Sequence, residues 1–196
     1  MIKLYYNPQS RASITRWMLD ECGAAYTLKP IDFKAGENKT PEFLALNPSG
    51  KLPVLVEGEQ VLFESSAIGL FLGDRFPEAG LAPAIHSPQR GKYLTLAVYA
   101  TSQLEPAMGD TFLNQEASSA RGWTSFEQAQ NLIAEAIGEG PYLLGENFSM
   151  ADILVGSVFI WRRLFGQSDE LPTIKSYIDR LLARPHAIPM PQTESV

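Results

Sequence analysis

The chain has 196 residues, of which 45% are hydrophobic and 19% charged, the composition of an ordinary soluble globular protein. The net charge of −6 and pI near 5.0 exclude the basic surface that nucleic acids require and argue against anionic membranes. The sequence shows no signal-peptide pattern and no long apolar run that would span a membrane. Cys22 is the only cysteine, so an internal disulfide and a C-x-x-C redox pair are excluded, and we expect a reducing, cytoplasmic setting.

The first 31 residues are predicted to form a strand, a helix and a second strand. Residues 2–6 are rich in β-forming side chains, and 7–10 read as a turn. Residues 11–21 carry apolar side chains at the spacing of one helix face, and Gly23 is a natural residue to follow a helix end. Residues 26–31 can form the next strand, parallel to the first because a helix lies between them.

The stretch NPSGKLPVLVEGEQVLFESSAI (47–68) predicts a proline-led strand, a hairpin and a new helix. Pro53 precedes an apolar run, which suits the first residue of a strand. After the returning strand, Glu64 and two serines open an apolar helix, and a serine is well placed to cap it. A helix start with free N–H groups suits a carboxylate, and Glu64 can receive an ammonium. Together they suit an amino-acid-like group that carries both charges.

The second half of the chain is predicted to be helical. Residues 77–88 are rich in proline and read as a linker, and Ser87-Pro88 is expected to start a helix that Pro106 kinks or ends. Two capping boxes are predicted, at 125–128 and at 149–152, and a final helix at 172–183. We interpret Ser149 and Asp152 as structural residues, outside any active site.

Four segments of the chain are similar to motifs of one known family. They are YYNPQSRASITRWMLDE (5–21), PEFLALNPSGKLPVL (41–55), ESSAI (64–68) and FSMADI (148–153). In this order and spacing the chain resembles a cytosolic glutathione transferase over nearly its whole length. The resemblance implies an α/β plus all-α fold: a thioredoxin-like β-α-β-α-β-β-α domain at 1–77, a linker at 78–87 and an all-helical domain at 88–196.

The resemblance implies that a residue near the first turn activates the thiol of glutathione. Ser10 lies where the first strand passes into the first helix, so its hydroxyl can donate to a thiolate and the helix start favours negative charge. The same position also suits a plain helix cap. Tyr5 matches the family's tyrosine position when aligned through the TRW segment at 15–17, and Tyr6 matches it when counted from the strand. For both tyrosines the alternative is packing within the strand.

The glutathione-binding residues are predicted from the same resemblance. Pro53 resembles the family's cis-proline, Leu52 the residue whose backbone pairs with the cysteinyl group, and Glu64 with Ser65 the pair that binds the γ-glutamyl group. Two lysines are predicted for the glycyl carboxylate, Lys51 and, as a weaker candidate, Lys39. Arg11 and Ser13 are predicted to lie near the thiol.

The electrophile site is implied to lie between the first turn and the helical domain. Its expected lining residues are Tyr99, Met108, Phe112, Trp161 and Phe165, although aromatic residues at helical spacing are more often core. No zinc-ligand spacing is present, and the expected chemistry needs no metal.

We therefore predict a glutathione transferase of detoxification type that conjugates the thiolate of glutathione, its co-substrate, to apolar electrophiles. A homodimer is implied by the resemblance, with no nucleic acid or membrane as partner. Two alternatives stay open. One is glutathione-dependent reduction of disulfides or peroxides, or isomerisation. The other is a non-catalytic scaffold or ligand carrier.

Overall fold

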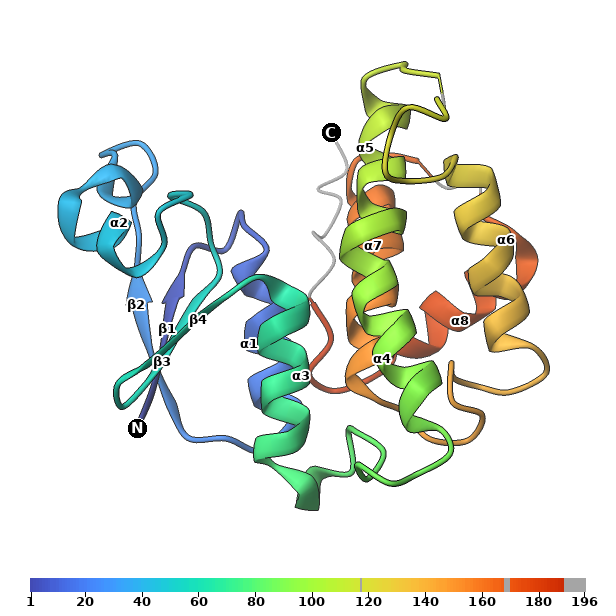
Figure 1. The fold of residues 1–196 in the computed structure, drawn as a ribbon, viewed down its shortest axis with the longest axis horizontal. Helices are drawn as coiled ribbons and strands as arrows, with labels where there is room; N and C mark the ends of the chain where they lie inside the picture. The colour runs from blue at the N-terminus through green and yellow to red at the C-terminus, as the bar shows by residue number, and fades with distance from the viewer. Residues whose placement is uncertain (117, 168–169, 189–196) are drawn as a thin grey trace, which may run out of the picture.

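The computed structural model describes residues 1–116, 118–167 and 170–188. A four-stranded sheet lies at one end of the molecule and a bundle of helices at the other, with two helices of the first domain between them (Figure 1). The final part of the expected helical domain, residues 189–196, lies outside the described ranges. No helix within those ranges combines the length and apolar character that crossing a membrane requires.

The first domain has the predicted thioredoxin-like topology. Its strands lie in the order β2-β1-β3-β4, with β1 parallel to β2 and antiparallel to β3. The strands are β1 Ile2–Tyr6, β2 Tyr26–Pro30, β3 Val54–Glu57 and β4 Gln60–Phe63. The helices are α1 Ala12–Glu21, α2 Pro41–Leu46 and α3 Ser65–Arg75, with short 3₁₀ turns η1 Glu37–Lys39 and η2 Pro77–Ala79.

The alternating pattern of β1 divides the side chains of the first domain between the two faces of the sheet. Ile2 and Leu4 are buried in the main core together with the α1 residues Trp17 and Met18. Tyr5 points to the other face, where its ring meets Phe43 of α2 edge to face at 5.8 Å. Successive strand residues face opposite sides of the sheet. The side chains on one face therefore pack against α1 and α3, and those on the other face pack against α2.

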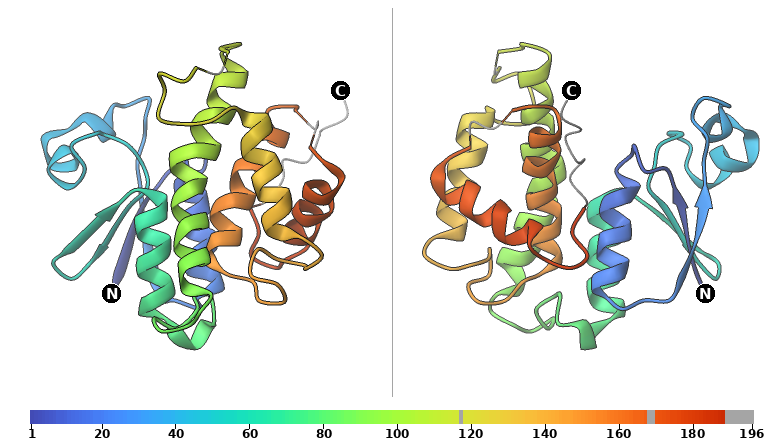
Figure 2. Two further views of the ribbon diagram at one scale, coloured as in Figure 1. Left: turned by 45° about the vertical axis from the view of Figure 1, so that its right-hand side comes forward. Right: turned by 180° about the vertical axis from the view of Figure 1, so that it is seen from behind.

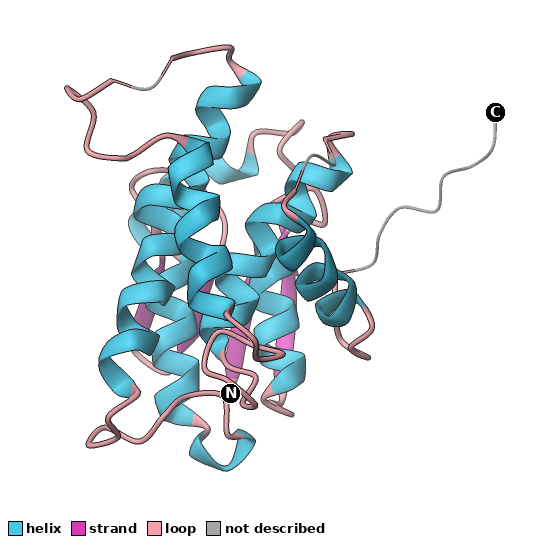
Figure 3. Ribbon diagram, turned by 90° about the vertical axis from the view of Figure 1, so that its right-hand side faces the viewer, coloured by secondary structure: helices cyan, strands magenta, loops and turns pink. Residues whose placement is uncertain are grey.

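The second domain is helical, as predicted. Its elements are α4 Arg90–Tyr99, the π-helical turn η3 Ala100–Leu104, α5 Glu105–Phe112, α6 Phe126–Ile137, α7 Met150–Leu164 and α8 Pro172–Leu182. Helix α7 is buried along nearly its whole length and packs against α4 and α8, and also against α1 and α3 (Figure 2). Seen from the side of the helical domain, the helices lie in front of the strands of the sheet (Figure 3). The chain then returns to the first domain, where Arg184 pairs with Glu21 at 2.6 Å.

The regular α-helix α4 ends before Pro106, at Tyr99, although the chain stays helical beyond it. The helical path continues from α4 through η3 into α5, and Pro106 stands in the first turn of α5. The N–H of Glu105 donates to Ala100 O, five residues back, as in a π-helix. A wider turn placed directly before the proline accommodates a residue that has no N–H to donate.

Two of the predicted helix starts need correction. No serine side chain caps α3: its N-cap is Glu64, and the Ser66 hydroxyl instead donates to Ala97 O of α4 at 2.8 Å. The α-helix expected from Ser87-Pro88 begins later, at Arg90, because the Ser87 hydroxyl accepts from the Gln89 N–H and closes a separate turn.

Of the other two predicted helix starts, the first forms in part and the second in full. The Ser125 hydroxyl accepts from the Gln128 N–H at 3.2 Å, although the Gln128 side chain bonds Thr124 instead of completing the box. The box at Ser149 and Asp152 is confirmed, and the Asp152 carboxylate accepts from the Ser149 N–H at 2.8 Å.

Candidate functional site

A cavity of about 490 Å³ lies where the first domain meets the start of α5. Six of the predicted glutathione-binding residues line it: Arg11, Lys51, Leu52, Pro53, Glu64 and Ser65. The further candidates Lys39 and Ser13 are not among its lining residues. Four lining residues were not predicted: Asn47, Ser49, Thr101 and Glu105. The structure thus brings together residues from the start of α1, the loop before β3, the start of α3 and the helical domain.

The loop before β3 is held by a buried asparagine. Asn47 is 1% exposed, and its amide nitrogen donates to Lys51 O at 2.9 Å while its Oδ1 accepts from the Ser49 N–H at 3.0 Å. These bonds fix the loop that carries Lys51 to the cavity. The Leu52–Pro53 peptide bond is cis, as predicted. An Asn-Pro-Ser-Gly segment is a turn signal, so the role of Asn47 was within reach of the sequence.

The start of α3 is left open at the cavity. Glu64, the N-cap residue, has φ 72° and ψ 122°, a backbone conformation uncommon for a residue other than glycine. Its side chain is exposed and makes no capping bond. Ser65 is 7% exposed and follows as the first helical residue. Because the first N–H groups of a helix have no partner within the helix, this start offers donors to an anionic ligand.

The helical domain contributes an acid and a hydroxyl to the cavity. Thr101 in η3 shares a 2.7 Å hydrogen bond with Ser66, which ties the start of α3 to the second domain. Glu105 forms an ion pair with Arg11 across the domain boundary. The Arg11 guanidinium also lies 5.5 Å from the centre of the Trp161 ring of α7. Neither Thr101 nor Glu105 carries a local sequence signal, because only domain docking brings them to this cavity.

Ser10 lies in the turn before α1 and does not line the cavity. Its hydroxyl donates to Asn7 O at 2.7 Å, and its oxygen accepts from the Ala12 N–H at 3.2 Å. The N-cap of α1 is Arg11, and the Ser10 contacts hold the turn that leads into the helix. Donation to a thiolate requires the hydroxyl proton to leave Asn7 O, so the catalytic role of Ser10 stays a prediction.

The two tyrosines of β1 lie away from the cavity as well. Tyr5 lines a hollow under α2 with Phe43 on the opposite face of the sheet. Tyr6 lies on the α1 side, where the Arg16 guanidinium is 5.8 Å from its ring centre. Both positions match the strand packing that the sequence offered as the alternative, and the role of Tyr5 in catalysis stays a prediction.

The predicted electrophile residues are brought together only in part. The Trp161 and Phe165 rings are 5.8 Å apart, and the Phe112 ring meets Phe165 at 5.3 Å, next to Arg11. The indole nitrogen of Trp161 is buried without a hydrogen-bond partner. Met108 is 4% exposed and belongs to the core, and Tyr99 is half-buried, with its pKa raised by that burial. An aromatic cluster thus lies beside Arg11.

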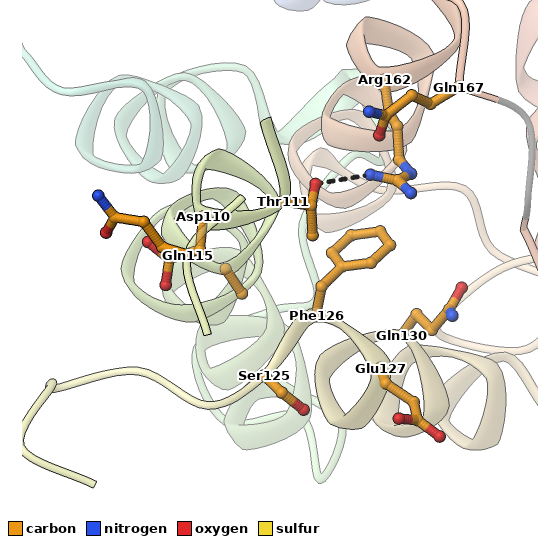
Figure 4. A pocket seen from close by; sticks show the side chains of 10 residues that line it. Asp110, Thr111, Gln115, Ser125, Phe126, Glu127, Gln130, Arg162 and Gln167 are labelled. Atoms are coloured by element: carbon orange, nitrogen blue, oxygen red, sulfur yellow. Dashed lines mark hydrogen bonds between the residues drawn. The ribbon is translucent and has the colours of Figure 1, made fainter. Parts of the chain in front are cut away.

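A second cavity, of about 670 Å³, lies within the helical domain between α5, α6 and α7 (Figure 4). Arg162, 4% exposed, donates to the Thr111 hydroxyl at 2.9 Å and lies 4.3 Å from the centre of the Phe126 ring. The Asp110 carboxylate at the rim pairs with Arg121. None of the predicted electrophile residues lines this cavity. Met108 and Phe112 lie on α5, as the lining residue Thr111 does, but they are not part of the lining.

Cys22 is buried near the carboxyl end of α1, as expected of a structural cysteine. Burial, with smaller contributions from Glu78 and Glu21, raises the pKa of its thiol to about 12. The thiol is therefore protonated at neutral pH and unsuited to nucleophilic attack. Within the described ranges, no group of three or more His, Cys, Asp or Glu side chains is arranged to hold a metal ion.

Comparison with known proteins connects this geometry to one family. Residues 1–74 match the model of the glutathione S-transferase N-terminal domain. Glutathione S-transferase 1 of Dianthus caryophyllus is 30% identical over 84% of this chain and 79% of its own length. The disulfide-bond oxidoreductase YfcG of Escherichia coli is 28% identical over 94% of this chain and 92% of its own.

A solved structure extends the match to three dimensions. The theta class glutathione S-transferase from Xanthomonas axonopodis pv. citri, crystallised with glutathione bound, superposes with a TM-score of 0.75 at 31% identity over 94% of each chain. The similarity is less extensive for two plant relatives. The chain spans 40% of the length of maize glutathione S-transferase 3 and 61% of Arabidopsis thaliana glutathione S-transferase F14.

Proposed function

Because this chain belongs to the cytosolic glutathione S-transferase superfamily, we propose that it binds reduced glutathione in the 490 Å³ cavity and transfers the thiolate to an apolar electrophile. The observation that carries the proposal is the convergence of six sequence-predicted residues on one cavity that is open at a helix start.

The charges around the cavity are complementary to those of the tripeptide. The γ-glutamyl group has an ammonium and a carboxylate, which suit Glu64 and the free N–H groups at the start of α3. Lys51 suits the glycyl carboxylate as a point charge. The backbone of Leu52, at the cis bond before β3, suits the cysteinyl amide. This arrangement directs the thiol toward the start of α1.

The start of α1 then has to hold the sulfur as a thiolate. The helix N-terminus favours negative charge there, and Ser10 and Arg11 are the nearest predicted donors. The thiolate attacks the electrophilic carbon, a carbon–sulfur bond forms, and any leaving group departs with the electron pair of the bond that breaks. No covalent intermediate with the enzyme is needed. Positioning of the two reactants and stabilisation of the thiolate supply the rate.

Disulfide reduction is the second candidate function, favoured by the similarity to the E. coli oxidoreductase along nearly the whole chain. Cys22 is unsuited to it because its thiol is buried and protonated. Such a reaction would use two glutathione molecules: one thiolate attacks the substrate disulfide and the second releases the mixed disulfide as oxidised glutathione. The cytoplasmic location and the two-fold dimer stay predictions, and sedimentation over a concentration series would check the dimer.

The proposal is tested by the thiol pKa of bound glutathione, followed by the ultraviolet absorbance of the thiolate against pH. We expect saturable binding and a pKa well below the free thiol value, which is near 8.5. Activity assays with an aryl halide and with a small disulfide then separate conjugation from reduction. Binding without a pKa shift would instead indicate a carrier, and absence of binding would refute the proposal.

A further inference from the structure

Arg11 and Glu105 form an ion pair within the lining of the 490 Å³ cavity. Arg11 is the residue directly before α1, and Glu105 is the first residue of α5, so the pair joins the two domains. Both side chains line the cavity and are partly exposed, Arg11 over 32% of its side-chain surface and Glu105 over 26%. The contact therefore lies at the place to which the proposed function directs the thiol.

The π-helical turn brings Glu105 to this position. η3 spans Ala100–Leu104 and is followed at once by Glu105, whose N–H bonds to Ala100 O. Thr101 within the turn and Glu105 directly after it both line the cavity. A π turn inserted between two α-helical segments changes the face that the second segment presents, and such turns are frequent at functional sites.

Arg11 is the basic lining residue that stands at the start of α1, where the proposed function places the thiol. The Ser10 hydroxyl is already occupied by Asn7 O, and Lys51 is carried by the separate loop before β3. A guanidinium has five N–H donors, and the ion pair with Glu105 leaves others free. An arginine that is one-third exposed has many rotamers open to it, so a thiolate benefits from it only if something holds its position.

We propose that Glu105 is a positioning residue for thiol activation: its carboxylate holds the Arg11 guanidinium at the start of α1, where the remaining N–H groups stabilise the bound thiolate. The centre of the Trp161 ring lies 5.5 Å from the guanidinium carbon and gives Arg11 a second contact with the helical domain. This inference rests on glutathione being the ligand. It makes thiol activation depend on the docking of the helical domain, which supplies both Glu105 and Trp161.

The decisive variant is Glu105→Ala, and the readout is the thiol pKa of bound glutathione. Loss of the anchor should raise that pKa by about one unit, which corresponds to a tenfold loss of thiolate stabilisation, and lower kcat with little change in Kd for glutathione. Glu105→Gln keeps a polar oxygen of the same reach beside Arg11, so its bound thiol pKa should stay at or below the wild-type value.

The sign of the shift separates positioning from simple charge. If Glu105 acted only through its negative charge, its removal would lower the thiol pKa, because a nearby anion disfavours a thiolate. A lowered or unchanged pKa in Glu105→Ala therefore overturns the proposal. In an Arg11→Met background the same substitution should have no further effect, since the positioning acts through Arg11. A full effect in that background would also overturn it.

A matched control comes from another ion pair between the domains. Asp74 of α3 pairs with Arg90 of α4 at 2.7 Å, away from the cavity lining. Asp74→Ala removes an interdomain ion pair as Glu105→Ala does, but it should leave the thiol pKa unchanged. An equal shift in both variants would mean that domain docking in general is responsible and would overturn the specific role of Glu105.

The same experiment separates failure of this inference from failure of the proposed function. A wild-type protein that does not bind glutathione, or binds it without lowering its thiol pKa, contradicts the proposed function. A wild-type protein that lowers the pKa, with a Glu105→Ala variant that lowers it equally, contradicts only the role of Glu105.

Discussion

The starts of α3 and α7 are built from the same residue types and are used in opposite ways. Each has serine and an acidic residue at its beginning, Glu64-Ser65 in α3 and Ser149 with Asp152 in α7. In α7 the Asp152 carboxylate is fully buried and accepts from the Ser149 N–H at 2.8 Å and from the Leu143 N–H at 2.8 Å. In α3 the Glu64 side chain is exposed, and no side chain caps the helix.

The difference shows what distinguishes a structural helix start from a binding one. Where the chain's own side chains satisfy the N–H groups, nothing is left for a ligand, and the residues stabilise the fold. Where the start faces a cavity without a cap, the unsatisfied donors are available for an external anion. The position of the acid differs between the two: Asp152 stands three residues after the N-cap and folds back onto the Ser149 N–H, whereas Glu64 is itself the N-cap and its side chain makes no capping bond.

The largest expected effect is on stability, in Asp152→Ala. The substitution leaves the Leu143 and Ser149 N–H groups and the Tyr177 hydroxyl without their acceptor in the core. We expect the free energy of unfolding to fall by about 3–5 kcal/mol, measured by urea denaturation. Glutathione affinity of the folded fraction should be unchanged. A loss below about 1 kcal/mol would mean that this start is not the structural one.

Glu64→Ala should give the reverse pattern. Loss of the carboxylate that pairs with the ligand ammonium should weaken glutathione binding about tenfold to a hundredfold by titration calorimetry, because hydrogen bonds to charged groups contribute about 1.5–3 kcal/mol. Stability should hardly change. Glu64→Gly serves as a companion: it should bind as weakly as the alanine variant, yet be more stable than it, because glycine adopts φ 72° without strain. Unchanged affinity in both would remove Glu64 from the site.

Ser10→Ala tests the start of α1, where the Ser10 hydroxyl accepts from the Ala12 N–H. If the hydroxyl donates to the thiolate, kcat with a general electrophile should fall about tenfold, a typical loss for one hydrogen bond to a charged group, with glutathione affinity retained. Tyr5→Phe is the control and should leave kcat unchanged. Survival of activity in Ser10→Ala and its collapse in Tyr5→Phe would assign catalysis to the tyrosine.

The smallest expected effect is a pH dependence at Asp152. Burial raises the pKa of this carboxyl, although hydrogen bonds from Leu143, Ser149 and Tyr177 oppose the shift. Because the folded state then binds the proton more tightly, the stability that it contributes is full below the unfolded pKa, about 4, and is lost as the pH rises through the native pKa. The difference in unfolding free energy between wild type and Asp152→Asn should thus decline from pH 4 to 8. An increase would show that the hydrogen bonds outweigh burial.

The first domain was predictable in detail because its signals are local. The turn before α1, the proline before β3 and the hairpin lie within short segments, and each specifies its own conformation. The binding residues predicted between 51 and 65 lie in the same segments, and their assignment came from the resemblance of these segments to a known family. The serine cap on α3 was predicted wrongly because local propensity favours it, whereas Glu64 takes a positive φ and the Ser66 hydroxyl is used to contact α4.

The contributions of the helical domain were predictable only in part. Periodicity identifies the apolar face of a helix but does not show which residues reach a neighbouring domain, so Thr101 and Glu105 were missed. The same limit applies to Met108, which was expected to line the electrophile pocket but is buried in the core. Trp161 was predicted for the electrophile site, but its contact with Arg11 depends on how α7 docks against α1.

The π-helical turn at Ala100–Leu104 also bears on how the helical domain can change by insertion and deletion. Each residue of an α-helix advances the path by about 100°, so the loss of one residue here would restore regular α-helix and rotate all of α5 by that angle. Glu105 would leave the cavity, and the contacts of Ala107 and Met108 with the core would be redistributed. The turn therefore sets the rotation of α5 about its own axis. Its length, more than the identity of its side chains, determines which face of α5 meets the first domain.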